Sequence, residues 1–397
     1  MDTRARGGEE MDYFLTKDQE MIKELARQIA QERVLPVRAE LDEKEEFPWE
    51  IMRLLAQSGL FGVYLPEQYG GTGGGCLDLC IATEELSRVC GGVAVSYAAS
   101  ALGAIPILLF GSDAQKKKYL PSVASGQKLA AFALTEPNAG SDAAAVQTSA
   151  IKKGDSYVLN GTKQWITNGG EAAIYTVIAR TDKEKGIRGL SAFIVEKDTP
   201  GFSFGKKEKK MGIRASATRE LIFTDCSVPA ENRLSREGMG FPVAMRTFDQ
   251  SRPGVAAQAV GIAQGALDEA VRYSRERHQF DKPISSFQGI QFMMAEMATL
   301  VEAARALVYA VAKALDAGGK DLSRESAMAK LFASDVAMRV TTDAVQIFGG
   351  YGYMRDYPVE KMMRDAKITQ IYEGTNQIQR SIIALSLIKD AGSKKPK

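Results

Sequence analysis

The sequence contains few of the side chains that most often bind metal ions or act as nucleophiles. Its 397 residues include a single histidine, His278, and four cysteines, at positions 76, 80, 90 and 226. No cysteine pair has the CxxC spacing and none lies near the histidine, which argues against a zinc site and, in a chain this long, against a disulfide framework. We therefore expect no metal and four free thiols in a reducing compartment.

A strong excess of charge is also missing. Fifty-one Lys and Arg against 49 Asp and Glu leave a formal net charge of +2. Proteins that bind nucleic acid or anionic membranes need a broad basic surface, and this chain has no added basic domain but only the short tail at 392–397. We expect no nucleic-acid partner, while a local basic pocket for a phosphorylated ligand stays open.

No segment has the pattern of a targeting or membrane signal. Residues 1–10 are polar and partly acidic, which fits neither a secretory signal nor an organelle transit peptide. We expect a cytoplasmic protein, or one of the mitochondrial matrix if the chain is a processed eukaryotic one. Residues 93–110 carry no charge, but serines, a glycine and a proline interrupt them, so a helix packed on all sides explains them better than a membrane span.

The spacing of apolar residues changes twice, which predicts three domains in an α+β fold. The first domain, residues 1–130, has helical spacing from residue 14 onward. Residues 131–240 contain short β-branched and aromatic runs between turn signals, typical of a small antiparallel barrel or sandwich. Asn160-Gly161 predicts a hairpin, because a type I′ turn needs positive φ at both positions. Residues 241–397 return to helical spacing.

The C-terminal third predicts a helix bundle. Long helices are expected over roughly 241–276, 284–316 and 323–348, joined by short loops as in antiparallel bundles. A further helix begins near Tyr357 and ends at Glu373-Gly374, and a last one starts at Thr375 or Asn376, since either is a good N-cap.

One acidic residue has the setting of a catalytic base. Glu373 lies between an aromatic residue and a glycine in IYEGTNQIQR, at the break between two helices. An apolar neighbourhood raises the pKa of a carboxyl group and fits it for proton transfer. The alternative is a helix-terminal surface glutamate, and this segment alone leaves both open.

Two segments of the middle domain suit a flat polar ligand. In FALTEPNAGSD, residues 132–142, a strand runs into a loop of small residues that offers backbone N–H groups and the hydroxyls of Thr135 and Ser141. In QWITNG, Trp165 and Thr167 lie two positions apart and point to one side of a strand. These features predict half of a flavin platform or, alternatively, ordinary turn and strand packing.

Six motifs together resemble the acyl-CoA dehydrogenase family over residues 14–390. They are YLPEQYGG, TEPNAGSD, QWITNG, RERHQF, DAVQIFGGYGY and MRDAKITQIYEGTNQIQR, and they occur in the family's order and spacing. The short- and medium-chain, straight-chain branches are the most similar. The resemblance implies an N-terminal helical domain, a middle β domain and a C-terminal four-helix bundle.

The resemblance also implies FAD, bound without a Rossmann motif and shared across a subunit interface in a homotetramer, a dimer of dimers. Arg277, one of the matched residues, suits the phosphate oxygens of the cofactor, because a guanidinium can bind them in bidentate fashion. By motif matching the cofactor contacts are Phe132, Ala133, Leu134, Thr135, Ser141, Trp165, Ile166, Thr167, Arg277, Phe280, Gln288, Gln346, Ile347, Phe348, Gly349, Gly350, Thr375, Asn376 and Gln377.

For the substrate, the resemblance implies an acyl-CoA of short to medium chain length, desaturated to a trans-2-enoyl-CoA in fatty acid β-oxidation. Glu373 matches the catalytic base, which removes the α-proton while the β-hydride passes to the flavin. Electrons then go to an electron-transfer flavoprotein. The matched substrate contacts are Ser141, Asp249, Gln250, Ser251, Arg252 and Gly374.

Two departures from other branches narrow this interpretation. Isovaleryl-CoA members place the base before the Arg of SRPG, where this chain has Ser251, so Glu373 carries the role alone. Glutaryl-CoA members use an Arg near the position of Ala94, which disfavours a dicarboxylic substrate. The alternatives are an acyl-CoA oxidase that uses oxygen, a dehydrogenase for a cyclic or branched acyl-CoA, and a non-enzymatic flavoprotein on the same scaffold.

Overall fold

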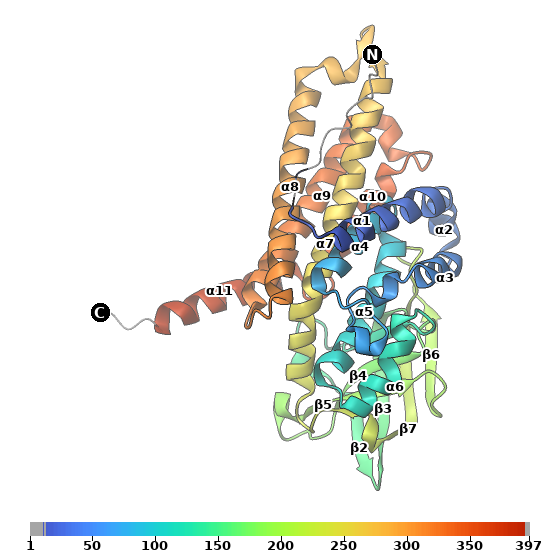
Figure 1. The fold of residues 1–397 in the computed structure, drawn as a ribbon, viewed down its shortest axis with the longest axis vertical. Helices are drawn as coiled ribbons and strands as arrows, with labels where there is room; N and C mark the ends of the chain where they lie inside the picture. The colour runs from blue at the N-terminus through green and yellow to red at the C-terminus, as the bar shows by residue number, and fades with distance from the viewer. Residues whose placement is uncertain (1–10, 12, 394–397) are drawn as a thin grey trace.

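The chain divides into a helical N-terminal part, a β-sheet part and a long C-terminal helix bundle (Figure 1). The computed structural model describes Met11 and residues 13–393. Residues 1–10, on which the expectation about targeting signals rests, and the last four residues of the basic tail lie outside that range. The arrangement confirms the α+β fold with helices on both sides of the β domain in the sequence.

The N-terminal helices begin at well-defined caps. The Thr16 side chain accepts from the Gln19 N–H and the Ser112 side chain accepts from the Gln115 N–H, each in a capping box. The helices are α1 (Lys17–Ile29), α2 (Arg38–Lys44), α3 (Trp49–Gln57), α4 (Cys76–Val89), α5 (Gly91–Phe110) and α6 (Asp113–Ala124).

Helix α5 is the uncharged segment that raised the question of a membrane span. Its length and composition would suffice to cross a membrane, but 72% of its most apolar 18-residue stretch is buried within the protein. It packs between α4, α7 and strand β1. Gly103 lets it approach that strand, because a Cβ there would lie 2.3 Å from the Ala131 nitrogen. The interpretation as a core helix is supported.

Within the described residues, eight strands form one mixed sheet in the order β6-β7-β3-β2-β4-β5-β8, with β1 pairing with β4. Most neighbours are antiparallel, whereas β1 and β4 run parallel. The strands are β1 (Ala130–Ala133), β2 (Ser149–Lys153), β3 (Ser156–Thr167), β4 (Ile174–Arg180), β5 (Leu190–Glu196), β6 (Phe202–Lys207), β7 (Thr218–Pro229) and β8 (Arg233–Leu234).

The hairpin predicted at Asn160-Gly161 was wrong. Both residues lie inside the continuous strand β3, at a register shift in its pairing with β7. Gly161 is needed there because a Cβ would lie 2.7 Å from the Thr148 Cα, not because the chain turns. The hairpin between β2 and β3 instead turns at Gly154, whose φ is +57°. A glycine that is required by the close approach of a neighbouring backbone thus resembled a turn signal.

The C-terminal bundle has the expected long helices. They are α7 (Gly240–Glu276), α8 (Gln288–Asp316), α9 (Ser323–Phe348), α10 (Val359–Thr369) and α11 (Asn376–Ser393), with a small β9–β10 ribbon (His278–Gln279, Lys282–Pro283) after α7. Helix α10 ends four residues earlier than predicted. Glu373 and Gly374 have φ of +51° and +91°, a left-handed turn that separates α10 from α11.

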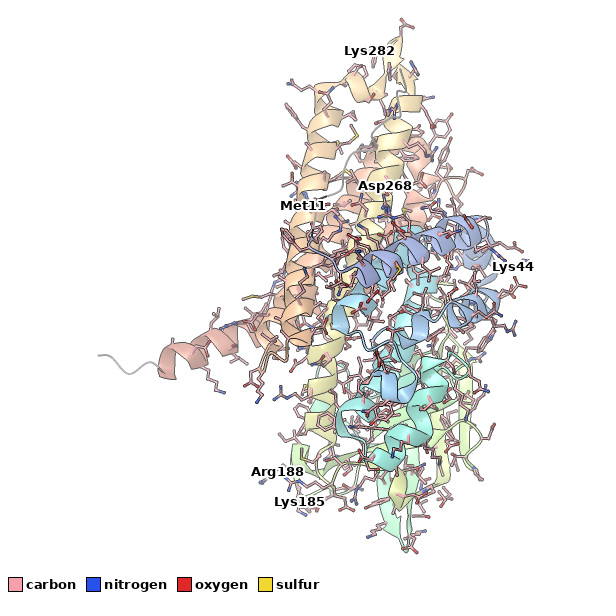
Figure 2. The ribbon with its side chains drawn as sticks, in the orientation of Figure 1. Met11, Lys44, Lys185, Arg188, Asp268 and Lys282 are labelled. Carbon is pink, nitrogen blue, oxygen red and sulfur yellow. The ribbon has the colours of Figure 1, made fainter. Side chains whose placement is uncertain are left out.

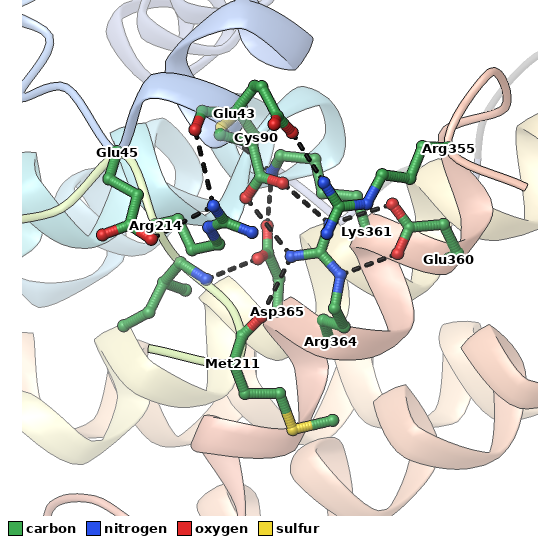
Figure 3. A network of polar contacts seen from close by, with 12 residues as sticks. Glu43, Glu45, Cys90, Met211, Arg214, Arg355, Glu360, Lys361, Arg364 and Asp365 are labelled. Carbon is green, nitrogen blue, oxygen red and sulfur yellow. Dashed lines mark hydrogen bonds and ion pairs between the residues drawn. The ribbon is translucent and has the colours of Figure 1, made fainter. Parts of the chain in front are cut away.

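A buried polar network joins the three parts of the chain (Figure 3). The Arg364 guanidinium of α10 binds Asp42 of α2 at 2.7 Å. Asp365 accepts from the backbone N–H of Ile213, in the loop before β7, and from Lys361 Nζ, both at 2.5 Å. Asp365 and Lys361 are almost fully buried, so each charge depends on the other for compensation.

We expect Asp365→Asn to lower the free energy of unfolding by about 3–5 kcal/mol, because the Lys361 ammonium would stay buried without a countercharge. Thermal unfolding followed by circular dichroism measures the change. The double variant Lys361→Met/Asp365→Leu removes both charges and should regain much of the loss. Equal midpoints for the single variant and the wild type would contradict the assignment of this pair as a buried, mutually dependent one.

Candidate active site

A cavity opens where the sheet meets α5, α7 and the loop after α10. Its wall is largely apolar and includes a few polar groups, as in most small-molecule sites. The lining residues are Leu79 of α4; Val95, Ala98, Ala99, Leu102 and Ile105 of α5; Phe132, Leu134 and Thr135; Trp165, Ile166 and Thr167 of β3; Phe248, Ser251, Gly254, Val255 and Gln258 of α7; and Tyr372 and Glu373.

Glu373 presents its carboxylate to this cavity. The Ser251 hydroxyl donates to Glu373 Oε2 at 2.5 Å, which fixes the carboxylate against α7. Burial raises the pKa of Glu373, although the Ser251 hydrogen bond and the positive charges of Arg252 and Lys330 lower it in part. The carboxyl group is therefore a stronger base than an exposed glutamate, as a proton-abstracting group requires.

The left-handed turn at Glu373 leaves its backbone N–H available. Within the described residues this N–H has no acceptor, whereas the Glu373 carbonyl accepts from Gln379 Nε2 at 3.0 Å. The neighbouring Tyr372 hydroxyl donates to Gln258 of α7. The turn is thus anchored on one side and offers a hydrogen-bond donor beside the carboxylate.

The β domain supplies an aromatic wall with unused hydroxyls. Trp165 has φ of +58° at a bulge in β3, and the residue is 55% exposed. The bulge lets Trp165, Ile166 and Thr167 all reach the cavity, beyond what regular strand alternation would allow. In the described part of the chain, the hydroxyls of Thr135 and Thr167 make no hydrogen bond. An aromatic face and two free hydroxyls suit the edge of an isoalloxazine ring.

A buried ion pair fixes the loop that carries Thr135. Glu136 accepts from Lys163 Nζ at 2.6 Å and from the backbone N–H groups of Gln147 and Thr148. Lys163 also donates to the Leu134 carbonyl at 2.9 Å. Burial lowers the pKa of Lys163 to about 8, although Glu136 opposes this shift. Charge-assisted hydrogen bonds thus help to hold the shape of the loop.

A second hollow lies at the other end of α7 and is lined by Arg277, Ile347, Phe348, Gly349 and Gly350, with Tyr273, Gln279, Ile284, Tyr351 and Met354. The Arg277 guanidinium lies 5.3 Å from the centre of the Tyr351 ring. Both glycines are exposed, and a Cβ on either would meet nothing within 4 Å. A guanidinium beside exposed backbone suits phosphate oxygens.

The two hollows are far apart in one chain. Positions 251 and 277 differ by 26 along α7, which corresponds to about 39 Å at 1.5 Å per helical residue. In Figure 2, Lys282, which is close to Arg277 in sequence, lies at the end of the bundle that is remote from the sheet. One dinucleotide cannot reach both hollows of a single chain.

Several residues matched by resemblance lie outside both hollows. Ser141 is exposed on its loop, and the side chains of Phe280, Gln288 and Gln346 are exposed near the second hollow without lining it. Ala133 is buried within β1. Their proposed contacts stay predictions.

The residues around Ser251 and Gly374 are partly committed to internal contacts. Asp249 binds Arg252 Nη1 at 3.0 Å, and Gln250 lines a third hollow beside α4. Thr375 caps α11, Gln377 is exposed, and the Asn376 side chain is buried against Lys330, Ser334 and Asp335. Their proposed contacts also stay predictions.

Three residues that support Glu373 were not predicted from the sequence, namely Gln258, Lys330 and Gln379. Lys330 carried a readable signal, because a lysine occupies the buried stripe of α9 three residues after Ala327 and seven before Ala337. Gln258 and Gln379 carried none, since a glutamine at a helix position is equally common on a surface.

Comparison with known proteins gives a consistent result. Models of the acyl-CoA dehydrogenase N-terminal, middle and C-terminal domains match residues 16–127, 131–226 and 238–388. The short-chain-specific acyl-CoA dehydrogenase of Clostridium acetobutylicum is 51% identical over 375 residues, which cover 94% of this chain and 99% of that relative.

Two solved structures share the fold along their whole length. Butyryl-CoA dehydrogenase from Megasphaera elsdenii has a TM-score of 0.93 and 51% identity, covering 95% of this chain and 100% of its own. A chain in a structure described as the electron transferring flavoprotein of Acidaminococcus fermentans has a TM-score of 0.94 and 54% identity, covering 96% and 100%. With three domain models matched in order and about half of the residues identical to such relatives, the chain belongs to the acyl-CoA dehydrogenase family.

Proposed function

We propose that this enzyme desaturates a short-chain acyl-CoA between its α and β carbons to give a trans-2-enoyl-CoA. The observation that carries the proposal is the Glu373 carboxylate, which shares one apolar cavity with the aromatic wall of Trp165 and the free hydroxyls of Thr135 and Thr167. The relatives named for butyryl-CoA and for short-chain substrates support the chain length.

The groups at and around the Glu373 carboxylate have separate roles. Glu373 removes the α-proton, and Ser251 orients the carboxylate through the hydrogen bond to Oε2. The free Glu373 N–H donates to the thioester oxygen and stabilises the charge that develops there. The apolar walls exclude water, which keeps the carboxylate poorly solvated and basic. FAD, when bound, supplies the acceptor for the β-hydrogen as hydride.

The cofactor site is completed by a second copy of the chain. Thr135, Trp165 and Thr167 would hold the ring end, while Arg277 with Gly349 and Gly350 would hold the pyrophosphate and adenosine end of a partner's cofactor. The 39 Å estimate along α7 supports this division. Helix α11 projects from the body of the chain (Figure 1) and exposes Leu385, Leu387 and Ile388, as an assembly helix would. We infer a homotetramer.

The electron acceptor in this proposal is an electron-transfer flavoprotein. The similarity to a chain from the electron-transferring flavoprotein structure of Acidaminococcus fermentans supports it. The alternative acceptor is oxygen, which would make the protein an oxidase.

Anaerobic titration with butyryl-CoA is expected to bleach the flavin absorbance of the wild-type enzyme. Glu373→Gln should keep FAD and acyl-CoA binding but lose at least about a thousandfold of the reduction rate, since the amide cannot accept the α-proton. Stopped-flow absorbance at the flavin band measures the reduction rate of the wild type and of the variant. Near-normal reduction by Glu373→Gln would remove the proposed base. Rapid peroxide formation when the reduced enzyme meets air would favour the oxidase.

The reduction rate should rise with pH through the raised pKa of Glu373, because only the ionised carboxylate accepts a proton. Ser251→Ala removes a hydrogen bond that lowers this pKa. In this variant the acidic limb of the pH profile, over which the reduction rate rises, should therefore move to higher pH. Ser274→Ala, a buried serine of the same helix that bonds to the Val271 carbonyl, is the control and should leave the limb in place. The pH profile of reduction decides between them.

Arg277→Met should weaken FAD retention by about tenfold or more, because a charge-assisted phosphate contact is lost. Equilibrium dialysis of the cofactor against the apoenzyme measures it. Arg275→Met, an exposed arginine two residues earlier, should bind FAD as the wild type does. Equal affinities for both variants would remove Arg277 from the cofactor site.

A further inference from the structure

Lys330 is a fully buried lysine that the proposed reaction does not use. It belongs to α9, and its side chain is 0% exposed. Its ammonium donates to the Gly374 carbonyl at 2.9 Å and to Asn376 Oδ1 at 2.8 Å. Burying a cation is costly unless strong acceptors or a countercharge compensate it. The first acceptor belongs to the turn that carries Glu373, and the second belongs to the residue that begins α11 directly after this turn.

The turn needs such an anchor. Glu373 holds φ of +51°, which a residue with a Cβ rarely adopts, and Gly374 follows at +91°. Two buried side chains fasten its carbonyls, because Gln379 Nε2 binds the carbonyls of Glu373 and Gly374 and Lys330 binds that of Gly374. Lys330 is the only one of the two that brings a charge.

We propose that Lys330 is a positioning residue for Glu373, which holds the left-handed turn at Gly374 and supplies the positive charge that balances the ionised carboxylate. This inference rests on the proposed function and adds to it a group outside the substrate cavity. Lys330 touches the turn and not the substrate, so it acts through Glu373.

The charges around Glu373 fit this role. Burial lowers the pKa of Lys330 to about 7, while Glu373 raises it, so each group favours the charged form of the other. The second cation nearby, Arg252, already binds Asp249. Among the described residues, Arg252 of α7 and Lys330 of α9 act on the Glu373 carboxylate, and Tyr372 precedes it in the same loop. Asp249 acts on Arg252 in turn, and Asp335 acts on Lys330.

The test is the pH profile of flavin reduction by butyryl-CoA in the full-length holoenzyme. Lys330→Met should lower the reduction rate at neutral pH by about tenfold to a hundredfold, because the base is displaced. The acidic limb should move to higher pH, since removal of a nearby cation raises the pKa of a carboxyl group. Lys330→Gln, which keeps a donor but no charge, should show the same shift and decides the matter if Lys330→Met does not fold.

Two further variants separate charge from structure. Lys330→Arg keeps the charge and should leave the limb near its wild-type position, even if the rate falls. Ser334→Ala removes an uncharged contact to the same Asn376 and should not move the limb. A fall in rate with an unmoved limb in both neutral variants would overturn the inference, as would unchanged rates. Failure of the wild-type enzyme to bleach with any acyl-CoA would instead overturn the proposed function.

Discussion

The arrangement of this molecule depends on one half-buried carboxylate. Glu373 lies at a left-handed turn between two helices, in contact with α7 through Ser251 and exposed to an apolar cavity. A carboxylate in such a place is costly and basic at once, because water no longer stabilises its charge. The surrounding groups make the cost tolerable, since Ser251 donates a hydrogen bond, Lys330 and Arg252 supply positive charge, and Gln379 fixes the backbone.

The cavity exists because three parts of the chain meet at fixed positions. Helix α5 and α7 form one side, the bulged strand β3 forms another, and the loop after α10 closes it. Buried ion pairs, not apolar contacts alone, set these positions. Asp365 with Lys361 ties the bundle to the loop before β7, and Glu136 with Lys163 shapes the loop after β1 (Figure 3 shows the first). Removing one partner of such a pair is strongly destabilising, because it leaves the other charge buried and uncompensated. The pairs therefore favour the one arrangement of the three parts in which both partners meet.

The sequence predicted most of the elements but misjudged individual positions for identifiable reasons. Asn160-Gly161 has the composition of a hairpin turn, yet a neighbouring backbone at Thr148 explains the glycine. Helix α10 was predicted to end at Glu373-Gly374, because a glycine often follows a helix end, whereas it ends at Thr369 and the left-handed turn comes four residues later. Such positions depend on contacts between segments distant in the sequence, which a local pattern does not contain.

The sequence by itself determined the family, the order of helical and β domains, and Glu373 as the candidate base. Motif order and apolar spacing depend only on the order of residues along the chain, so they need no knowledge of the fold. Only the tertiary structure decided that Glu373, Trp165, Thr135 and Ser251 share a cavity, and that Lys330 lies beneath the turn. It also separated Arg277 from that cavity by most of the length of α7. The physical reason is that a pKa, an ion pair and a ligand cavity arise from distances in space, and segments more than a hundred residues apart in the chain set those distances.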